Sequence, residues 1–231
     1  MRVLSLHPGA TAMVVALGAS PLLVGRTDEC AMIAGNVPSI GPKAEITPEK
    51  IAIFEPDIIL LGADQSFMAS NTYVIHPETL EGAARMITTL AGLLGKPIEA
   101  EMIVHELRLI TDAVRERAQR FHRVRTIVLE QSKDVHPALV RQVLELCGAV
   151  QVLESERPQC GVVLSDDEEF VERVEDRSRH ISSLNERIYT INPRLFWPTE
   201  LRECILLLAK YLHGVELPHL VNQSAVSSSM S

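Results

Sequence analysis

Short continuous apolar runs alternate with stretches of helical spacing over the first part of the chain. Val3–Leu6 and Ile58–Leu61 are apolar runs of strand length, which are typical of strands covered on both faces. Residues 80–94 instead repeat apolar side chains at helical spacing, between the capping residue Thr79 and Gly95. Strands that alternate with helices in this way predict a parallel sheet with helices packed against it.

A long helical pattern separates this first part from a second one of the same kind. Residues 98–121 contain no Gly or Pro, and a helix of this length extends roughly 35 Å. Strands and helices then alternate again up to residue 212. The predicted fold is therefore α/β, with two small parallel-sheet α/β lobes joined by one long helix and a ligand cleft between the lobes. The predicted boundaries are 1–96 for the first lobe, 97–122 for the helix, 123–221 for the second lobe and 222–231 for a disordered tail.

The composition is that of an ordinary globular protein and argues against several kinds of partner. The 231 residues are 46% hydrophobic and 23% charged, with a formal net charge of −8. The densest basic run is Arg115–Arg125, which is no concentrated phosphate-binding patch, so we expect no nucleic-acid partner. The apolar stretches fall far short of the roughly 20 residues that cross a membrane, so we expect no membrane insertion.

The chain start and the cysteines bear on the compartment. The apolar run after Arg2 ends at His7–Gly9, which is too short for the core of a secretory signal. The cysteines form no C-x-x-C pair and are expected to be small buried residues that hold no metal; they are Cys30, Cys147, Cys160 and Cys204. Both features predict a cytoplasmic protein as the sequence is written. A periplasmic or extracellular location would require that a signal had been removed.

Several segments match the pattern of one known family. The segments RVLSLHPGAT, ALG and LVGRTDEC at 2–30 resemble its first strand, helix and second strand, and ITPEKIAIFEPDIILL at 46–61 resembles its next helix and strand. In the second half, Gln142–Gly148 and Asn192–His213 are also similar. The chain thus resembles the helical-backbone (class III) periplasmic-type solute-binding proteins of ABC importers. The resemblance is to the branch that binds cobalamin (vitamin B12), iron-siderophore or haem complexes, and it implies such a tetrapyrrole or metal chelate as the ligand.

Two departures from the family pattern bear on its partners. The family carries a further helix after the strand at Ile58–Leu61, whereas here only Gly62–Thr72 precedes the next strand. A second helix is missing after Leu153. Family members offer an acidic side chain from each lobe to the membrane permease, and the first deletion removes a segment of the kind that carries one. An ABC permease is therefore a possible but doubtful partner.

The loops that follow the strands are the expected ligand site, because ligands of parallel α/β folds bind beyond the carboxyl ends of the strands. The loop at 7–11 leads directly into a helix, whose free backbone N–H groups attract a carboxylate or phosphate. Trp197 lies on a predicted loop and is suited to stacking on a ring system. The predicted ligand-binding residues are Ser5, His7, Pro8, Gly9, Thr11, Arg26, Asp28, Glu29, Asp64, Gln131, Arg194, Phe196 and Trp197.

Structural roles compete with several of these assignments. A histidine after a strand is more often a hydrogen-bonded structural residue than a ligand, which competes with a binding role for His7. Asp28 and Glu29 are more typical of a solvated ion-pair cluster around Arg26. Trp197 could pack in the core. Aromatic residues make up only 4% of the chain, and Phe54 is expected to be buried in the first lobe, so few rings remain for a large flat ligand.

The predicted function is non-catalytic binding of a cobalamin-like or chelated-metal ligand in the cleft between the lobes. Nucleophile elbows, phosphate loops, dinucleotide fingerprints and paired zinc histidines are missing from the sequence, so we do not expect an enzyme. Two alternatives stay open. One is a cytoplasmic cofactor-handling enzyme that uses His7, Asp28 and Glu29. The other is an interaction module on the same fold that has lost ligand binding and permease docking.

Overall fold

The computed structural model describes residues 1–63, 71–130, 132, 134–165, 167, 171–174, 176, 181 and 187–214. Its contacts divide the chain into two compact units. The first comprises Met1–Val104 and Trp197–Thr199, and the second comprises His105–Phe196 and the chain from Glu200 onward. The predicted site residues Asp64 and Gln131 and the predicted tail at 222–231 lie outside the described residues.

The first unit is built on a five-stranded parallel sheet in the order β3-β2-β1-β4-β5. Its helices begin as the sequence predicts, since Thr47 caps α2 and Thr79 caps α3 by accepting hydrogen bonds from Lys50 and Gly82 backbone N–H groups. The strands are β1 Val3–Ser5, β2 Leu23–Thr27, β3 Ser39–Gly41, β4 Ile58–Gly62 and β5 Thr72–Ile75, and the helices are α1 Pro8–Ala16, α2 Pro48–Ile53 and α3 Leu80–Leu94.

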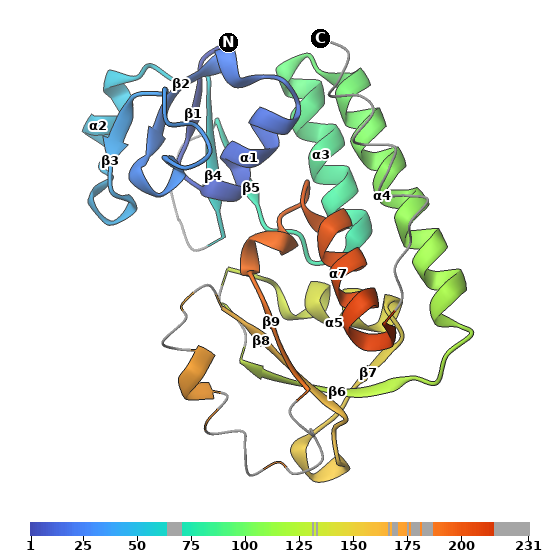
Figure 1. Ribbon diagram of the computed structural model, residues 1–231. Coiled ribbons are helices and arrows are strands. Elements are labelled where there is room, and N and C mark those ends of the chain that lie inside the picture. The colour runs from blue at the N-terminus through green and yellow to red at the C-terminus, as the bar shows by residue number, and fades with distance from the viewer. Residues whose placement is uncertain are drawn as a thin grey trace. The chain divides into compact units, whose positions relative to one another are not determined.

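Strand β4 shows how the sheet separates two cores. Its alternate residues face opposite sides, as the strand period of two requires. Leu60 belongs to a large cluster with α1, α3 and the start of α4, whereas Leu61 belongs to a smaller cluster beside α2. Figure 1 shows α2 on the other side of this sheet from α1 and α3. The continuous apolar run of β4 therefore reflects burial on both faces.

The second unit contains a four-stranded parallel sheet in the order β7-β6-β8-β9. As the sequence predicts, no α-helix lies between β7 and β8, and residues 152–159 contain only the short helix η4, Glu154–Glu156. The strands are β6 Val124–Glu130, β7 Ala149–Gln151, β8 Cys160–Leu164 and β9 Ile188–Ile191, and the helices are α5 Pro137–Leu146 and α7 Leu201–His213. The predicted class, two parallel-sheet α/β lobes, is confirmed.

Some local predictions were wrong. Strand β3 was not predicted. The apolar run at 22–24 predicts a shorter second strand than β2, which extends to Thr27. The long helix α4 spans Pro97–Ala118 and so ends before residue 121. Phe54, expected to be buried, is only half-buried, because it follows the end of α2 and packs against the smaller core from one side. None of the described helices is both long and apolar enough to cross a membrane.

Candidate functional site

The loop between β1 and α1 lies at the carboxyl end of the first sheet's central strand. His7 is the N-cap of α1, and its Nδ1 accepts a hydrogen bond of 3.1 Å from the Gly9 N–H. Pro8 occupies the first turn, where the missing N–H costs nothing. Because Nδ1 is an acceptor here, that nitrogen carries no proton, and His7 can offer only Nε2 to a ligand.

A second histidine repeats this arrangement. His136 caps α5 in the second unit, and its Nδ1 accepts a hydrogen bond of 3.2 Å from the Ala138 N–H. Pro137 follows it as Pro8 follows His7. The repeated His-Pro cap shows that the His7 ring has a structural role in starting its helix, which was one of the two roles open at the sequence level.

Two of the predicted ligand-binding hydroxyls are fully buried and bonded to each other. The Thr11 Oγ1 donates to the Ser5 Oγ at 2.8 Å, and the Ser5 Oγ lies 3.3 Å from the His7 carbonyl oxygen. Both side chains have 0% exposure. This network fixes the β1–α1 turn beneath His7.

The Trp197 indole packs directly on Gly9. A Cβ atom at Gly9 would lie only 3.0 Å from the indole Cγ and Cδ1, so glycine permits this close approach. The indole also lies edge-on to the His7 ring, with centroids 6.4 Å apart and an interplanar angle of 64°. Trp197 belongs to the first unit by its contacts and is half-buried.

The loop after β2 binds its own charged side chains. Arg26 is buried, and its guanidinium donates to the carbonyl oxygens of Ala34 and Thr27, both at 2.9 Å. Asp28 lies 4.0 Å from that guanidinium and accepts a hydrogen bond from the Ser39 hydroxyl. These contacts join β2 to β3 and match the ion-pair reading of the cluster.

Glu29 is likewise tied to the main chain. Partial burial raises the pKa of its carboxyl, but hydrogen bonds, chiefly from the Lys43 backbone N–H at 3.0 Å, outweigh that effect. The net pKa lies below the ordinary 4.5. Glu29 therefore stabilises the loop as a carboxylate.

Replacing Glu29 with Gln is expected to lower the free energy of unfolding at pH 7 by about 0.5 kcal/mol, since solvent screens this exposed group. A lowered pKa stabilises the fold above the unfolded pKa, and this contribution disappears as the pH falls through the folded value. Urea midpoints at pH 7 and pH 3 should show the two proteins converging at acid pH. Glu106→Gln, on the exposed face of α4, is the control, and equal behaviour of both variants would contradict the assignment.

The predicted residues of the second unit differ in exposure. Phe196 is buried at 3% exposure in the short helix η6, Pro193–Phe196, whereas Arg194 is exposed. The Arg194 backbone N–H donates to the Asn192 Oδ1 at 2.9 Å, which holds the turn after β9. Phe196 thus packs within its unit, and its neighbour Trp197 is the more accessible ring.

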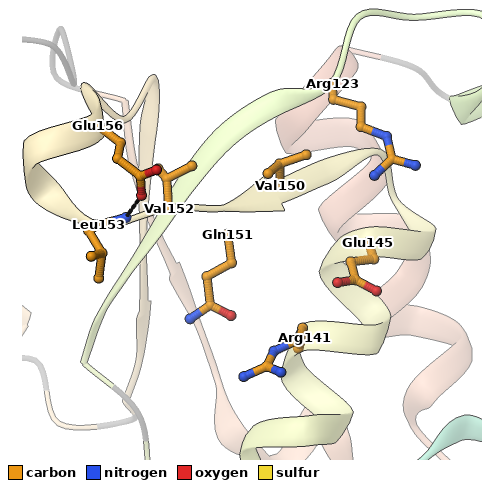
Figure 2. A pocket seen from close by; sticks show the side chains of 8 residues that line it. All are labelled: Arg123, Arg141, Glu145, Val150, Gln151, Val152, Leu153 and Glu156. Carbon is orange, nitrogen blue, oxygen red and sulfur yellow. Dashed lines mark hydrogen bonds between the residues drawn. The ribbon is translucent and has the colours of Figure 1, made fainter.

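A concave surface of the second unit was not anticipated from the sequence. Figure 2 shows the side chains that line it, from β7, α5 and their neighbours. Its volume is about 320 Å³. Its charged side chains balance, because Arg123 and Arg141 are matched by Glu145 and Glu156. The Glu156 carboxylate is already engaged by the Leu153 N–H at 2.7 Å. These residues converge only through the fold, and none of the predicted site residues lines this surface.

A family model described as periplasmic binding protein matches residues 3–143, which is more than half of the chain. The chain belongs to this family. Among curated protein sequences nothing matches.

Solved structures of periplasmic binding proteins share the fold at low identity. The vitamin B12 binding protein BtuF of Vibrio cholerae is 19% identical with a TM-score of 0.71, over 91% of this chain and 96% of its own. A heme binding protein from Pseudomonas aeruginosa is 15% identical with a TM-score of 0.70, over 93% of each chain. A periplasmic binding protein from Veillonella parvula is 16% identical with a TM-score of 0.74, over 94% of this chain and 92% of its own.

The described side chains of this periplasmic binding protein also bear on catalysis. The Ser5 hydroxyl contacts a hydroxyl and a carbonyl oxygen rather than the His7 ring, so Ser5 and His7 form no nucleophile–base pair as they stand. Within the described ranges, no three His, Cys, Asp or Glu side chains gather closely enough to hold a metal ion. The family and its solved relatives are binding proteins.

Proposed function

We propose that this protein binds a tetrapyrrole or another metal chelate, with a cobalamin-like ligand foremost, and releases it chemically unchanged. The ligand would lie beyond the carboxyl ends of the strands of the first sheet, at the loop between β1 and α1. The observation that supports this proposal is the position of Trp197, the one tryptophan of the chain, which is half-buried against Gly9 at the start of α1. The solved relatives named for heme and vitamin B12 supply the ligand class.

Three other described aromatic rings are less suited to stacking on a ligand. Phe196 is buried, and Tyr189 and Tyr211 stack on each other in the second unit with centroids 4.6 Å apart. An indole face gives a large ligand ring more contact area than any other side chain. Trp197 is therefore proposed to stack on the ligand.

Hydrogen bonds inside the first unit reduce the number of predicted residues that we propose to contact the ligand. Ser5, Thr11 and Arg26 are buried and already bonded, so we assign them to support of the turn. Trp197 and the Nε2 edge of His7 are proposed to touch the ligand. Asp64, Gln131 and Arg194 stay predictions as ligand contacts, as do the cytoplasmic location and the loss of permease docking.

Replacing Trp197 with Ala is expected to weaken binding of cyanocobalamin or haemin at least about tenfold, because a stacked aromatic pair contributes about 1 kcal/mol beyond its buried area. Absorbance titration in the visible range measures the affinity directly. Trp197→Phe should keep part of it.

Phe121→Ala is the matched control, since Phe121 is an exposed ring of the second unit that stacks on His213, away from the strand carboxyl ends. Its affinity should equal that of the wild type. Equal losses in both variants would mean that Trp197 has only a packing role.

A further inference from the structure

The hydrogen bond at the start of α1 fixes where the His7 ring carries its proton. Its Nδ1 accepts the Gly9 N–H at 3.1 Å, and a neutral imidazole has a single proton on one of its two nitrogens. The proton of His7 therefore lies on Nε2. This nitrogen is a hydrogen-bond donor without a lone pair, whereas coordination of a metal requires a lone pair.

The surrounding contacts hold the ring in this orientation. The His7 backbone is extended, with φ −140° and ψ 132°, and its carbonyl oxygen accepts the Thr11 N–H at 3.0 Å. His7 is 9% exposed, and a Cβ at Gly9 would lie 3.1 Å from Cε1 of its ring. Turning Nδ1 away from Gly9 would leave the Gly9 N–H without its acceptor and α1 without its cap.

Histidines that bind metals are held in the opposite way. Such a histidine coordinates through one nitrogen and donates the N–H of the other to a carbonyl or carboxylate oxygen. His213 has that arrangement in the second unit, since its Nε2 lies 2.8 Å from the Cys147 carbonyl oxygen, which accepts only from an N–H. His136 repeats the arrangement of His7, with its Nδ1 at 3.2 Å from the Ala138 N–H. The His-Pro cap thus makes both capping histidines donors at Nε2.

We propose that His7 binds the ligand as a hydrogen-bond donor through its Nε2–H and does not coordinate the ligand's metal. This inference rests on the proposed binding of a tetrapyrrole or another metal chelate beside Trp197. The acceptor is an oxygen at the edge of the ligand, from a carboxylate or a carboxamide group. Trp197, whose ring centroid lies 6.4 Å from that of His7, contacts the face of the ligand ring, and His7 contacts its edge.

This role decides which feature of the ligand His7 selects. A donor at Nε2 discriminates in favour of ligands with an oxygen acceptor, and its contribution to affinity is the same with or without a metal in the ring. A neutral hydrogen bond of this kind contributes roughly three- to tenfold in affinity. A histidine that coordinated iron would instead contribute only to the binding of the iron-containing ligand.

Haemin and protoporphyrin IX, which is the same ring without iron, separate the two roles. His7→Asn keeps a side-chain oxygen that can cap α1, but its shorter side chain no longer places an N–H at the position of Nε2. We expect the variant to bind each porphyrin about fivefold more weakly, with the two losses equal within about twofold. Absorbance titration with haemin and fluorescence titration with protoporphyrin IX give the four affinities. The Soret band of bound haemin should have the same position in both proteins.

His136→Asn is the matched control for the cap, because it makes the same change at the same kind of helix start in the second unit. The two variants should lose equally little stability in thermal unfolding. Other groups that could reach a metal, such as the 87% exposed Met32 on the loop after β2, are the same in wild type and His7→Asn, so they do not affect the comparison. A loss at least about tenfold larger for haemin than for protoporphyrin IX, or a shift of the Soret band on replacing His7, would overturn this inference alone. Unchanged affinity for both porphyrins would overturn it as well.

Aquocobalamin is the probe if the chain binds cobalamin and neither porphyrin, because the water on its cobalt can be replaced by a histidine nitrogen. Its visible bands should have the same positions when it is free and when it is bound. A shift on binding that His7→Asn removes would overturn the inference. Binding of none of these ligands to the wild type would instead overturn the proposed function, and this inference with it.

Discussion

Replacing Leu90 with Ala is expected to lower the free energy of unfolding by about 3 kcal/mol. Leu90 lies on the inner face of α3 with 0% exposure, in the large cluster of the first unit. Truncation removes the transfer free energy of the lost carbons and leaves a cavity that close-packed neighbours such as Ile87 and Leu60 fill only in part. Urea denaturation followed by circular dichroism measures the change.

The same helix provides the control. Leu93 lies one turn further along α3 and is 45% exposed, so Leu93→Ala removes the same atoms largely from water. Its cost should stay below about 1 kcal/mol. A Leu90→Ala variant no less stable than Leu93→Ala would mean that α3 does not pack on the sheet as described.

Replacing Gly25 with Ala is expected to cost about 2 to 3 kcal/mol, because the new methyl group has no space. Its Cβ would lie 2.5 Å from Cδ1 of the Phe54 ring and 2.8 Å from Cδ1 of Leu4. The Arg2 guanidinium donates to the Phe54 carbonyl oxygen at 2.7 Å, which anchors the main chain that carries the ring. Glu55, the next residue, adopts a left-handed φ of 43°.

A smaller side chain at position 54 should relieve this overlap. The double variant Gly25→Ala with Phe54→Leu is expected to be more stable than the sum of the single effects by at least about 1 kcal/mol. Gly161→Ala is the comparison for the stability loss of Gly25→Ala. A Cβ at Gly161 would lie 2.6 Å from Cδ1 of Leu129, and this flexible side chain can rotate away. Additive losses at Gly25 and Phe54 would contradict the packing described for the smaller core.

The helices and strands that were predictable from sequence carry a clear pattern of apolar or capping residues within their own segments. Strand β4 is a continuous apolar run because both of its faces are buried, and α3 has both a capping threonine and a terminating glycine. Strand β3 has no such signal. It has three residues, and its extended structure comes from pairing with β2, in which Ser39 lies opposite Arg26. Long-range pairing of this kind leaves no periodicity to detect.

The candidate site also contains features that the sequence predicts and features that only the fold creates. The placement of His7 before a proline and a helix predicts a role at the carboxyl end of β1, and the structure adds that its ring caps α1. The close packing of Trp197 on Gly9 joins residues far apart in the sequence, so neither position alone indicates it. The concave surface beside β7 is likewise a product of the fold, because Arg123, Arg141 and Gln151 are unremarkable as sequence.

The most direct test of the binding function is the thermal unfolding of the full chain with and without cyanocobalamin and haemin, read together with the fluorescence of its one tryptophan. A ligand at about 100 times its Kd adds about 2.7 kcal/mol of stability, which corresponds to a rise in Tm of roughly 5 to 10 °C in a chain of this size. We expect this rise, with quenching of the Trp197 fluorescence, for at least one of the two ligands. An unchanged Tm and unchanged fluorescence with both would contradict it.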